Sequence, residues 1–168
     1  MFNIFYEPIE SDFGWLHIFI AGRDISRYIY KGKQYCCACR AHALKSWFEN
    51  NLQYITSNYP YPIDVNGESG VQLWNNSEKL FGNCDVETSL RLLEKCQTWL
   101  WRHSIDTCRD EFCLPFVIFR RIGEQIEISW DNTAVQYQGV DFIDANGISY
   151  VPIGMFEDKV KAFLKTLK

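Results

Sequence analysis

Side chains capable of chemistry gather most densely just after residue 100. His103, Ser104, Asp106, Cys108 and Arg109 lie within seven positions of one another. A histidine general base needs a nucleophile within hydrogen-bond reach and a carboxylate that orients its ring. His103 with Cys108 or Ser104, oriented by Asp106, would supply these roles in a small hydrolase or nuclease. No Gly-x-Ser-x-Gly turn accompanies them, and the helix dipole favours a histidine near a helix C-terminus without any catalytic role.

A second cluster combines cysteines with a histidine. Cys36, Cys37 and Cys39 are followed by His42, and Cys39 and His42 would share a face of a helix at a spacing of three. Zinc sites usually draw further ligands from a distant segment, and the other cysteines are scattered. Packing of small, buried cysteines therefore explains the cluster better. We predict no metal or other cofactor, and keep Cys36, Cys39 and His42 as the alternative metal ligands.

Charge is segregated along the chain. Residues 122–158 contain seven acidic side chains and no lysine or arginine. If these carboxylates share one surface, they would attract a partner protein with a basic surface and accelerate its association. The alternative is a solvated face that only keeps the domain in solution. The residues that we expect to bind the partner are Glu127, Trp130, Asp131, Tyr137, Asp141 and Asp144, with the two aromatic side chains as anchors.

Basic residues concentrate in the first third, between Arg23 and Lys45, where Asp24 is the single acidic residue before Lys45. Tyr28, Tyr30 and Tyr35 are interleaved with them. On one surface, aromatic rings can stack on the bases of single-stranded nucleic acid while cations neutralise its phosphates. Binding of single-stranded nucleic acid is thus a further alternative function.

The whole chain limits these possibilities. Its 168 residues carry 17 basic and 21 acidic side chains, a net charge of −4 that argues against a general nucleic-acid binder. The length is typical of a single domain, here residues 1–168, that folds without a disulfide or a metal. No apolar run reaches the roughly 18 residues of a membrane helix, and no signal peptide is visible, so we expect a cytoplasmic protein. The seven cysteines are expected to be reduced thiols.

Hydrophobic periodicity predicts the elements that would position these residues. Short apolar runs predict strands at 2–6, 15–20 and 25–30, and apolar residues at spacings of three and four predict a helix over 34–54. Proline at positions 60 and 62 excludes helix there, and a short strand is expected at 71–74. The sequence thus begins with strands and continues with one helix and a loop.

The second half of the sequence predicts a helix, two hairpins and a final helix. Asp85 is a good N-cap for a helix over 86–103. Segments 115–121 and 125–130 form a predicted hairpin around Gly123-Glu124, with Ile126, Ile128 and Trp130 facing the core, Glu127 and Ser129 facing away, and Arg120 opposite Glu127. Asn146-Gly147 predicts the turn of another hairpin between 140–144 and 148–153, and a helix from 155 or 156 to 167 closes the chain.

Strands and helices do not alternate regularly in this order. The sequence therefore predicts an α+β fold, a mainly antiparallel sheet built from hairpins with about three helices packed on one face.

Three segments of the second half resemble those of a known group of proteins. They are WRHS at 101–104, LPFVIFRR at 114–121 and EISWDN at 127–132. From Trp101 onward the chain resembles small bacterial proteins of toxin-immunity and phage-defence gene neighbourhoods. This resemblance transfers no catalytic residue. It implies an immunity protein, antitoxin or antiviral defence-complex subunit, consistent with a non-enzymatic protein-binding module.

Overall fold

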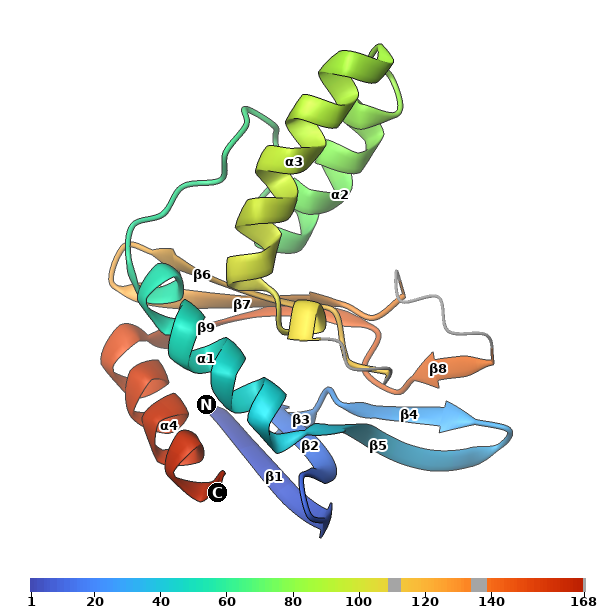
Figure 1. Ribbon diagram of the computed structural model, residues 1–168, viewed down its shortest axis with the longest axis vertical. Helices are drawn as coiled ribbons and strands as arrows, with labels where there is room; N and C mark the ends of the chain where they lie inside the picture. The colour runs from blue at the N-terminus through green and yellow to red at the C-terminus, as the bar shows by residue number, and fades with distance from the viewer. Residues whose placement is uncertain (109–112, 134–138, 168) are drawn as a thin grey trace.

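The protein is α+β with antiparallel sheets, as the sequence predicts (Figure 1). The computed structural model describes residues 1–108, 113–133 and 139–167, which contain nine strands and four α-helices. Each strand pairing within these residues is antiparallel. The strands form two separate sheets rather than one.

The larger sheet comes mainly from the first third of the chain. Its strands are β1 (Phe2–Glu10), β2 (Phe13–Ile20), β3 (Arg23–Asp24), β4 (Arg27–Tyr30), β5 (Lys33–Arg40) and β8 (Val140–Phe142). Their order is β1-β2-β5-β4-β8, with β3 paired to β2. One face of β1 and β2 is buried and the other is accessible, as the alternation of burial over residues 2–6 of β1 and along β2 shows.

The smaller sheet has the order β6-β7-β9 and is covered by helices on both faces. Its strands are β6 (Val117–Ile122), β7 (Gln125–Asp131) and β9 (Asn146–Pro152). The helices are α1 (Ala41–Thr56), α2 (Gly70–Phe81), α3 (Val86–His103), the short 3₁₀ helix Ile105–Cys108 and α4 (Ile153–Thr166). In Figure 1, α2 and α3 lie on one side of this sheet, whereas α1, α4 and the larger sheet lie on the other.

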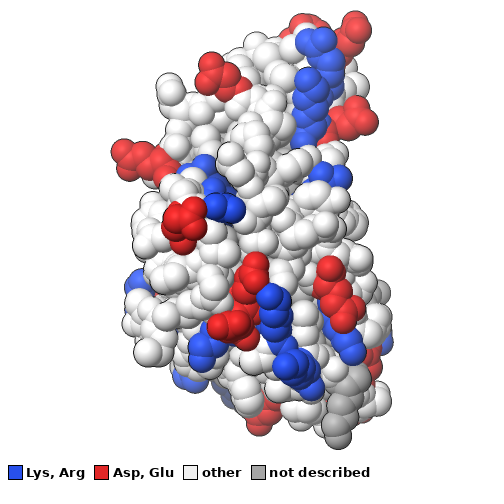
Figure 2. Space-filling view, turned by 90° about the vertical axis from the view of Figure 1, so that its left-hand side faces the viewer, with Lys and Arg blue, Asp and Glu red and all other residues white. Residues whose placement is uncertain are grey.

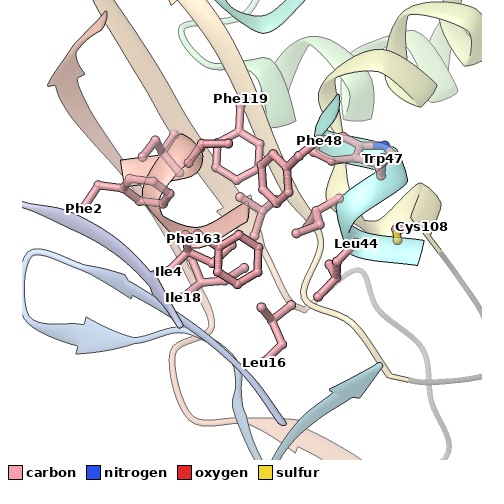
Figure 3. Close-up of a cluster of buried hydrophobic side chains, with 14 of the residues drawn as sticks. Phe2, Ile4, Leu16, Ile18, Leu44, Trp47, Phe48, Cys108, Phe119 and Phe163 are labelled. Atoms are coloured by element: carbon pink, nitrogen blue, oxygen red, sulfur yellow. The ribbon is translucent and has the colours of Figure 1, made fainter. Parts of the chain in front are cut away.

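The main core lies between the two sheets (Figure 3). Phe119 of β6 is fully buried at its centre and contacts the rings of Phe2, Phe48 and Phe156, with ring centroids 6.2, 6.4 and 5.4 Å away. These rings come from β1, α1 and α4 respectively. A second, smaller cluster joins α2 and α3 to the opposite face of the smaller sheet through Val71, Trp99, Phe116 and Ile118.

Several predicted elements are confirmed. The predicted helix over 86–103 has these bounds, and the Asp85 carboxylate accepts a hydrogen bond from the Thr88 amide at 2.9 Å as its N-cap. Gly123 and Glu124 form the two-residue turn of the β6–β7 hairpin, with Gly123 at a φ of +59°.

Two segments differ from their predicted structure. Residues 34–40, predicted to begin a helix, belong to β5, because Cys37 pairs with Leu16 of β2 in the sheet. Residues 71–74, predicted as a strand, are helical. The hydroxyl of Ser69 accepts a hydrogen bond from the Gln72 amide at 3.2 Å, so Ser69 is the N-cap of α2.

The second predicted hairpin is wrong. Asn146 and Gly147 do not form a turn but lie in β9, which pairs with β7, while β8 pairs with β4. Gly147 is opposite Trp130, and a Cβ added to this glycine would lie 2.3 Å from the indole ring. Here glycine makes room for a neighbouring ring rather than for a turn.

Within the described residues, no helix combines the length and the apolar character that crossing a membrane requires.

Candidate functional site

The expected acidic surface is interrupted at Glu127. This residue has no exposed surface, because α2 covers the face of β7 on which it lies. Its Oε2 accepts from Arg120 Nη2 at 2.6 Å, and its Oε1 accepts from the Gly70 amide at 2.6 Å. The predicted pairing with Arg120 is confirmed, but the pair is structural. Glu127 is unable to contact a partner, which corrects its assignment to a binding face.

Trp130 and Asp144 are also engaged within the molecule. Trp130 is 1% exposed, and its Nε1 donates to Asp144 Oδ1 at 3.1 Å. Asp144 Oδ2 lies 3.1 Å from Arg23 Nη1, so a basic residue from the first third neutralises it. Trp130 is therefore part of the core and not an exposed anchor.

The remaining expected binding residues differ in their surroundings. Asp141 is exposed on β8, Asp131 accepts hydrogen bonds from Asn75 and Thr133, and Tyr137 lies outside the described residues. Figure 2 shows one face of the molecule, on which acidic and basic side chains intermingle. The charge segregation of the sequence thus does not become one continuous acidic surface, because the fold brings arginines to two of these carboxylates.

The histidine of the proposed catalytic group is enclosed. His103 is 1% exposed and stacks on Trp99, with ring centroids 4.1 Å apart. Its Nδ1 lies 2.8 Å from the Trp99 carbonyl oxygen, and burial lowers its pKa to about 4. Ser104 Oγ is buried and has no hydrogen-bond partner among the described residues.

Asp106 and Cys108 are buried as well, and Cys108 belongs to the main core. The geometry gives His103 a packing role, with its ring stacked between Tyr59 and Trp99. Its pairing with Asp106 and Cys108 as a catalytic group is thus not supported.

The alternative metal ligands Cys36, Cys39 and His42 are not brought together. Because residues alternate between the faces of a strand, Cys39 faces the core with Cys37, while Cys36 lies on the opposite face of β5. His42 is in the first turn of α1, where its ring pairs with Asp12. The helical spacing on which this alternative depended does not exist.

The same alternation divides the basic segment. Arg27 pairs with Cys36 on one face of the larger sheet, whereas Tyr28 and Tyr35 stack on the other face with ring centroids 5.8 Å apart. Lys33, which lies opposite Tyr30, and Lys31, whose Nζ is 5.0 Å from the centroid of the Tyr30 ring, stay with the tyrosines. The cations are thus divided between the two faces, and the nucleic-acid alternative stays a prediction.

The accessible face of the larger sheet, which we call the outer face, carries a polar cluster that the sequence did not reveal. His17 of β2, Asp24 of β3 and Cys36 of β5 meet there. His17 Nδ1 lies 2.8 Å from Asp24 Oδ2 and 3.4 Å from Cys36 Sγ. Arg27 Nε donates to Asp24 Oδ2 at 3.0 Å. Pairing of strands that are distant in sequence creates this cluster, so local spacing offers no signal for it.

The electrostatics of the cluster disfavour a thiolate at Cys36. Burial, followed by the charge of Asp24, raises the pKa of the Cys36 thiol to about 12. Its Sγ–H donates to the Leu16 carbonyl oxygen at 3.0 Å. Asp24 and Cys36 also approach the same nitrogen of His17, whereas a nucleophile and an orienting carboxylate occupy opposite nitrogens in a catalytic triad.

A cleft of about 330 Å³ opens beside the cluster, with His17, Cys36, Glu7 and Trp15 in its wall. A second hollow of about 670 Å³ lies between Arg23 and Asn146 and shares Arg27 with the first. The cluster is thus reachable from solvent. A thiol, an imidazole and a carboxylate in this arrangement are a set that could hold a metal ion.

Another groove, of about 320 Å³, lies between α2 and the end of the smaller sheet. Val71, Gln72 and Asn75 of α2 form one wall, and Gly147 and Ile148 of β9 form the other. Glu68 and Asp131 supply carboxylates to its lining, which contains no lysine or arginine among the described residues. A helix beside an edge strand is an arrangement that accommodates an extended peptide.

Comparison with protein-family models, with curated proteins and with solved structures finds no match.

Proposed function

We propose that this protein is a non-enzymatic binding module that takes up an extended, basic segment of a partner protein along β9. The observation that carries this proposal is the character of β9 as an edge strand. Unpaired edge strands attract further strands, and proteins protect them with charges, prolines, bulges or short length. β9 has seven residues and none of them is charged.

The other long edge is protected. β1 carries Glu7, Pro8 and Glu10 towards its end, and its register shifts between Pro8 and Glu10. β8 has only three residues, and Ser104 forms a bridge to Ile118 of β6. Among the described strands, β9 is thus a long edge without a charged residue or a bulge, and its proline, Pro152, is its last residue.

The hydrogen-bond pattern shows which groups of β9 are available. Asn132 N–H donates to the Ala145 carbonyl at 2.7 Å, and Ile153 N–H donates to the Glu124 carbonyl at 3.3 Å. Because ladder bonds alternate along an antiparallel strand, the odd-numbered residues between these points face β7. The backbone groups of Ile148 and Tyr150 are therefore directed to the open edge.

Their side chains offer an apolar contact beside the groove. Ile148 and Tyr150 are 44% and 46% exposed, and they lie opposite Ser129 and Glu127, on the face of the sheet that α2 covers. An added strand would bond to the backbone of β9 and place alternate side chains against the groove.

Charge favours a basic partner over a second copy of this chain. Glu68 and Asp131 line the groove, and a second copy would bring the same two carboxylates to the interface. The resemblance of the C-terminal part to toxin-immunity and phage-defence proteins would make the partner a toxin or a defence-complex subunit. Binding would inhibit or assemble it by occupying its surface.

The test uses fluorescent synthetic peptides of about seven residues, the length of a typical strand, that alternate valine with lysine, glutamine or glutamate. We expect the lysine peptide to bind at least about tenfold more tightly than the glutamate peptide, with affinity that falls as salt rises. Slowed amide exchange at Ile148 and Tyr150 would locate it. No binding, or equal binding of all peptides, would count against the proposal, as would dimerisation of the free protein through β9.

Two substitutions at position 148 distinguish the contribution of the backbone to peptide binding from that of the side chain. Ile148→Pro removes an edge donor, whereas Ile148→Thr removes the same side chain and keeps the amide. Proline is tolerated on an edge strand where its nitrogen faces solvent. We expect Ile148→Pro to abolish peptide binding and Ile148→Thr to reduce it only a few-fold. Equal affinities of the two variants would exclude strand addition at β9.

A further inference from the structure

The cluster of His17, Asp24 and Cys36 on the outer face provides an inference that does not depend on the proposed binding at β9. Its three potential ligand atoms all lie within 4.8 Å of one another. They come from three strands of one sheet, so the backbone holds them in place. Among the described residues, no other group of three histidine, cysteine or acidic side chains has such proximity.

The donor set is typical of zinc. Zn²⁺ binds thiolate, imidazole nitrogen and carboxylate oxygen at about 2.0–2.3 Å, in tetrahedral geometry. Ligand atoms around such an ion are about 3–4 Å apart. The separations of 2.8 Å to Asp24 and 3.4 Å to Cys36 from His17 Nδ1 are close to that spacing. An ion could therefore enter with small side-chain movements.

A carboxylate also lies behind the histidine. His17 Nε2 is 3.9 Å from Glu7 Oε2, on the opposite side of the ring from Asp24 and Cys36. Metal-bound histidines usually donate their other ring N–H to a carboxylate, which orients the ring and makes it a better ligand. A small movement of the exposed Glu7 side chain would bring it within hydrogen-bond distance of Nε2, which would make Glu7 a positioning residue for the site.

Proton and charge balance are consistent with a divalent ion. Binding forms an S–M bond at Cys36 and releases its thiol proton to solvent, while His17 coordinates through Nδ1 and keeps its ring proton on Nε2, facing Glu7. The thiolate and the Asp24 carboxylate then neutralise the two positive charges of the ion. Arg27, which donates to Asp24 at 3.0 Å, remains a hydrogen-bond donor to the ligand oxygen.

We propose that His17 Nδ1, Asp24 Oδ2 and Cys36 Sγ form a Zn²⁺ site whose fourth position opens into the cleft that His17 and Cys36 line. Three protein ligands and one open position are the pattern of zinc sites that bind an exchangeable water or small ligand. The cleft of about 330 Å³ has room for such a ligand.

The test titrates the full-length, chelator-treated and reduced protein with Co²⁺, whose spectrum reports its ligands. We expect one equivalent to produce a thiolate-to-cobalt charge-transfer band and the intense visible bands of tetrahedral Co²⁺, and Zn²⁺ to displace it. Cys36→Ser should remove the charge-transfer band and weaken Co²⁺ binding at least about 100-fold. Absence of binding by the unmodified protein would overturn the proposal.

A matched control separates this thiol from the others. Cys84, in the turn between α2 and α3, has the same intermediate exposure as Cys36 and belongs to no such cluster. Cys84→Ser should keep the full cobalt spectrum. A spectrum that survives in Cys36→Ser, or is lost in Cys84→Ser, would place the metal elsewhere and contradict the assignment.

A second variant covers the case in which Cys36→Ser does not fold. The Glu7 side chain is 62% exposed, so Glu7→Gln leaves the core untouched. It should keep the thiolate band and weaken Zn²⁺ binding about tenfold, as loss of an outer carboxylate does. An unchanged Zn²⁺ affinity in Glu7→Gln would contradict the metal-bound orientation of His17.

Discussion

At the scale of single residues, environment decides which titratable groups do chemistry. His103 and His17 are both histidines on regular elements, but His103 is enclosed between aromatic rings and His17 faces a cleft beside a thiol. Only the second can meet a ligand. The first instead links stability to pH, because its neutral form is the one that fits the core.

The pH dependence follows from the depressed pKa of His103. Its pKa is about 4 in the folded protein against 6.5 in an unfolded chain, so the unfolded state binds more protons between these values. We expect His103 to contribute stability that is fully present above pH 6.5 and is lost as pH falls towards 4, up to about 3 kcal/mol.

Urea denaturation across this range checks the prediction, with His103→Phe as the control because it retains an aromatic ring against Trp99. The free energy of unfolding of the unmodified protein should fall more steeply towards acid than that of the variant. Parallel curves for the two proteins would show that His103 does not carry the linkage.

At the scale of elements, Glu127 connects a strand to the start of a helix. Its carboxylate binds Arg120 across the β6–β7 hairpin and accepts the amide of Gly70, the first residue of α2. A negative charge at a helix N-terminus is favourable, and this one is removed from water. Glu127 therefore helps to fix the position of α2, and with it one wall of the β9 groove, together with the Val71–Ser129 and Asn75–Asp131 hydrogen bonds.

Removal of this charge should be costly. Glu127→Gln leaves Arg120 without its counter-charge, and we expect a loss of about 2–4 kcal/mol in unfolding free energy together with faster amide exchange in the first turn of α2. Glu124→Gln is the matched control, since Glu124 pairs with Arg121 on the same hairpin but its side chain is 90% exposed. The control should lose less than about 1 kcal/mol. Similar losses would show that burial does not set the strength of the pair.

At the scale of the whole molecule, the two sheets share one core. The ring of Phe119 reaches both sheets and the helices α1 and α4 (Figure 3). Side chains of both sheets and of the helices between them pack into the same apolar interior. The predicted single domain should therefore unfold in one cooperative step.

Truncation of this ring tests that prediction. Phe119→Ala should lower the unfolding free energy by about 3–5 kcal/mol, whereas Phe5→Ala, which removes a half-exposed ring from the outer face, should cost about 1 kcal/mol or less. Circular dichroism and tryptophan fluorescence should report the same transition. Separate transitions in the two signals would mean that the sheets belong to independently unfolding units.

The local sequence pattern predicted an element correctly where that element is determined by its own residues. The helix over 86–103 follows from its apolar spacing and the Asp85 cap, and the β6–β7 hairpin follows from alternation around Gly123. The pattern failed at residues 34–40, where small cysteines are compatible with both the helical and the strand period. It also failed at Gly147, where the glycine makes room for the Trp130 ring and does not form a turn.

By itself, the sequence determined the α+β class and the elements whose periodicity is strong, because hydrophobic spacing is a property of each segment. Tertiary structure alone decided which charges remain exposed and which residues form a site. Arg23 reaches Asp144 and α2 covers Glu127 across more than fifty residues of chain, while His17, Asp24 and Cys36 meet only when their strands pair. Burial and ion pairing depend on such distant neighbours, and no local spacing specifies them.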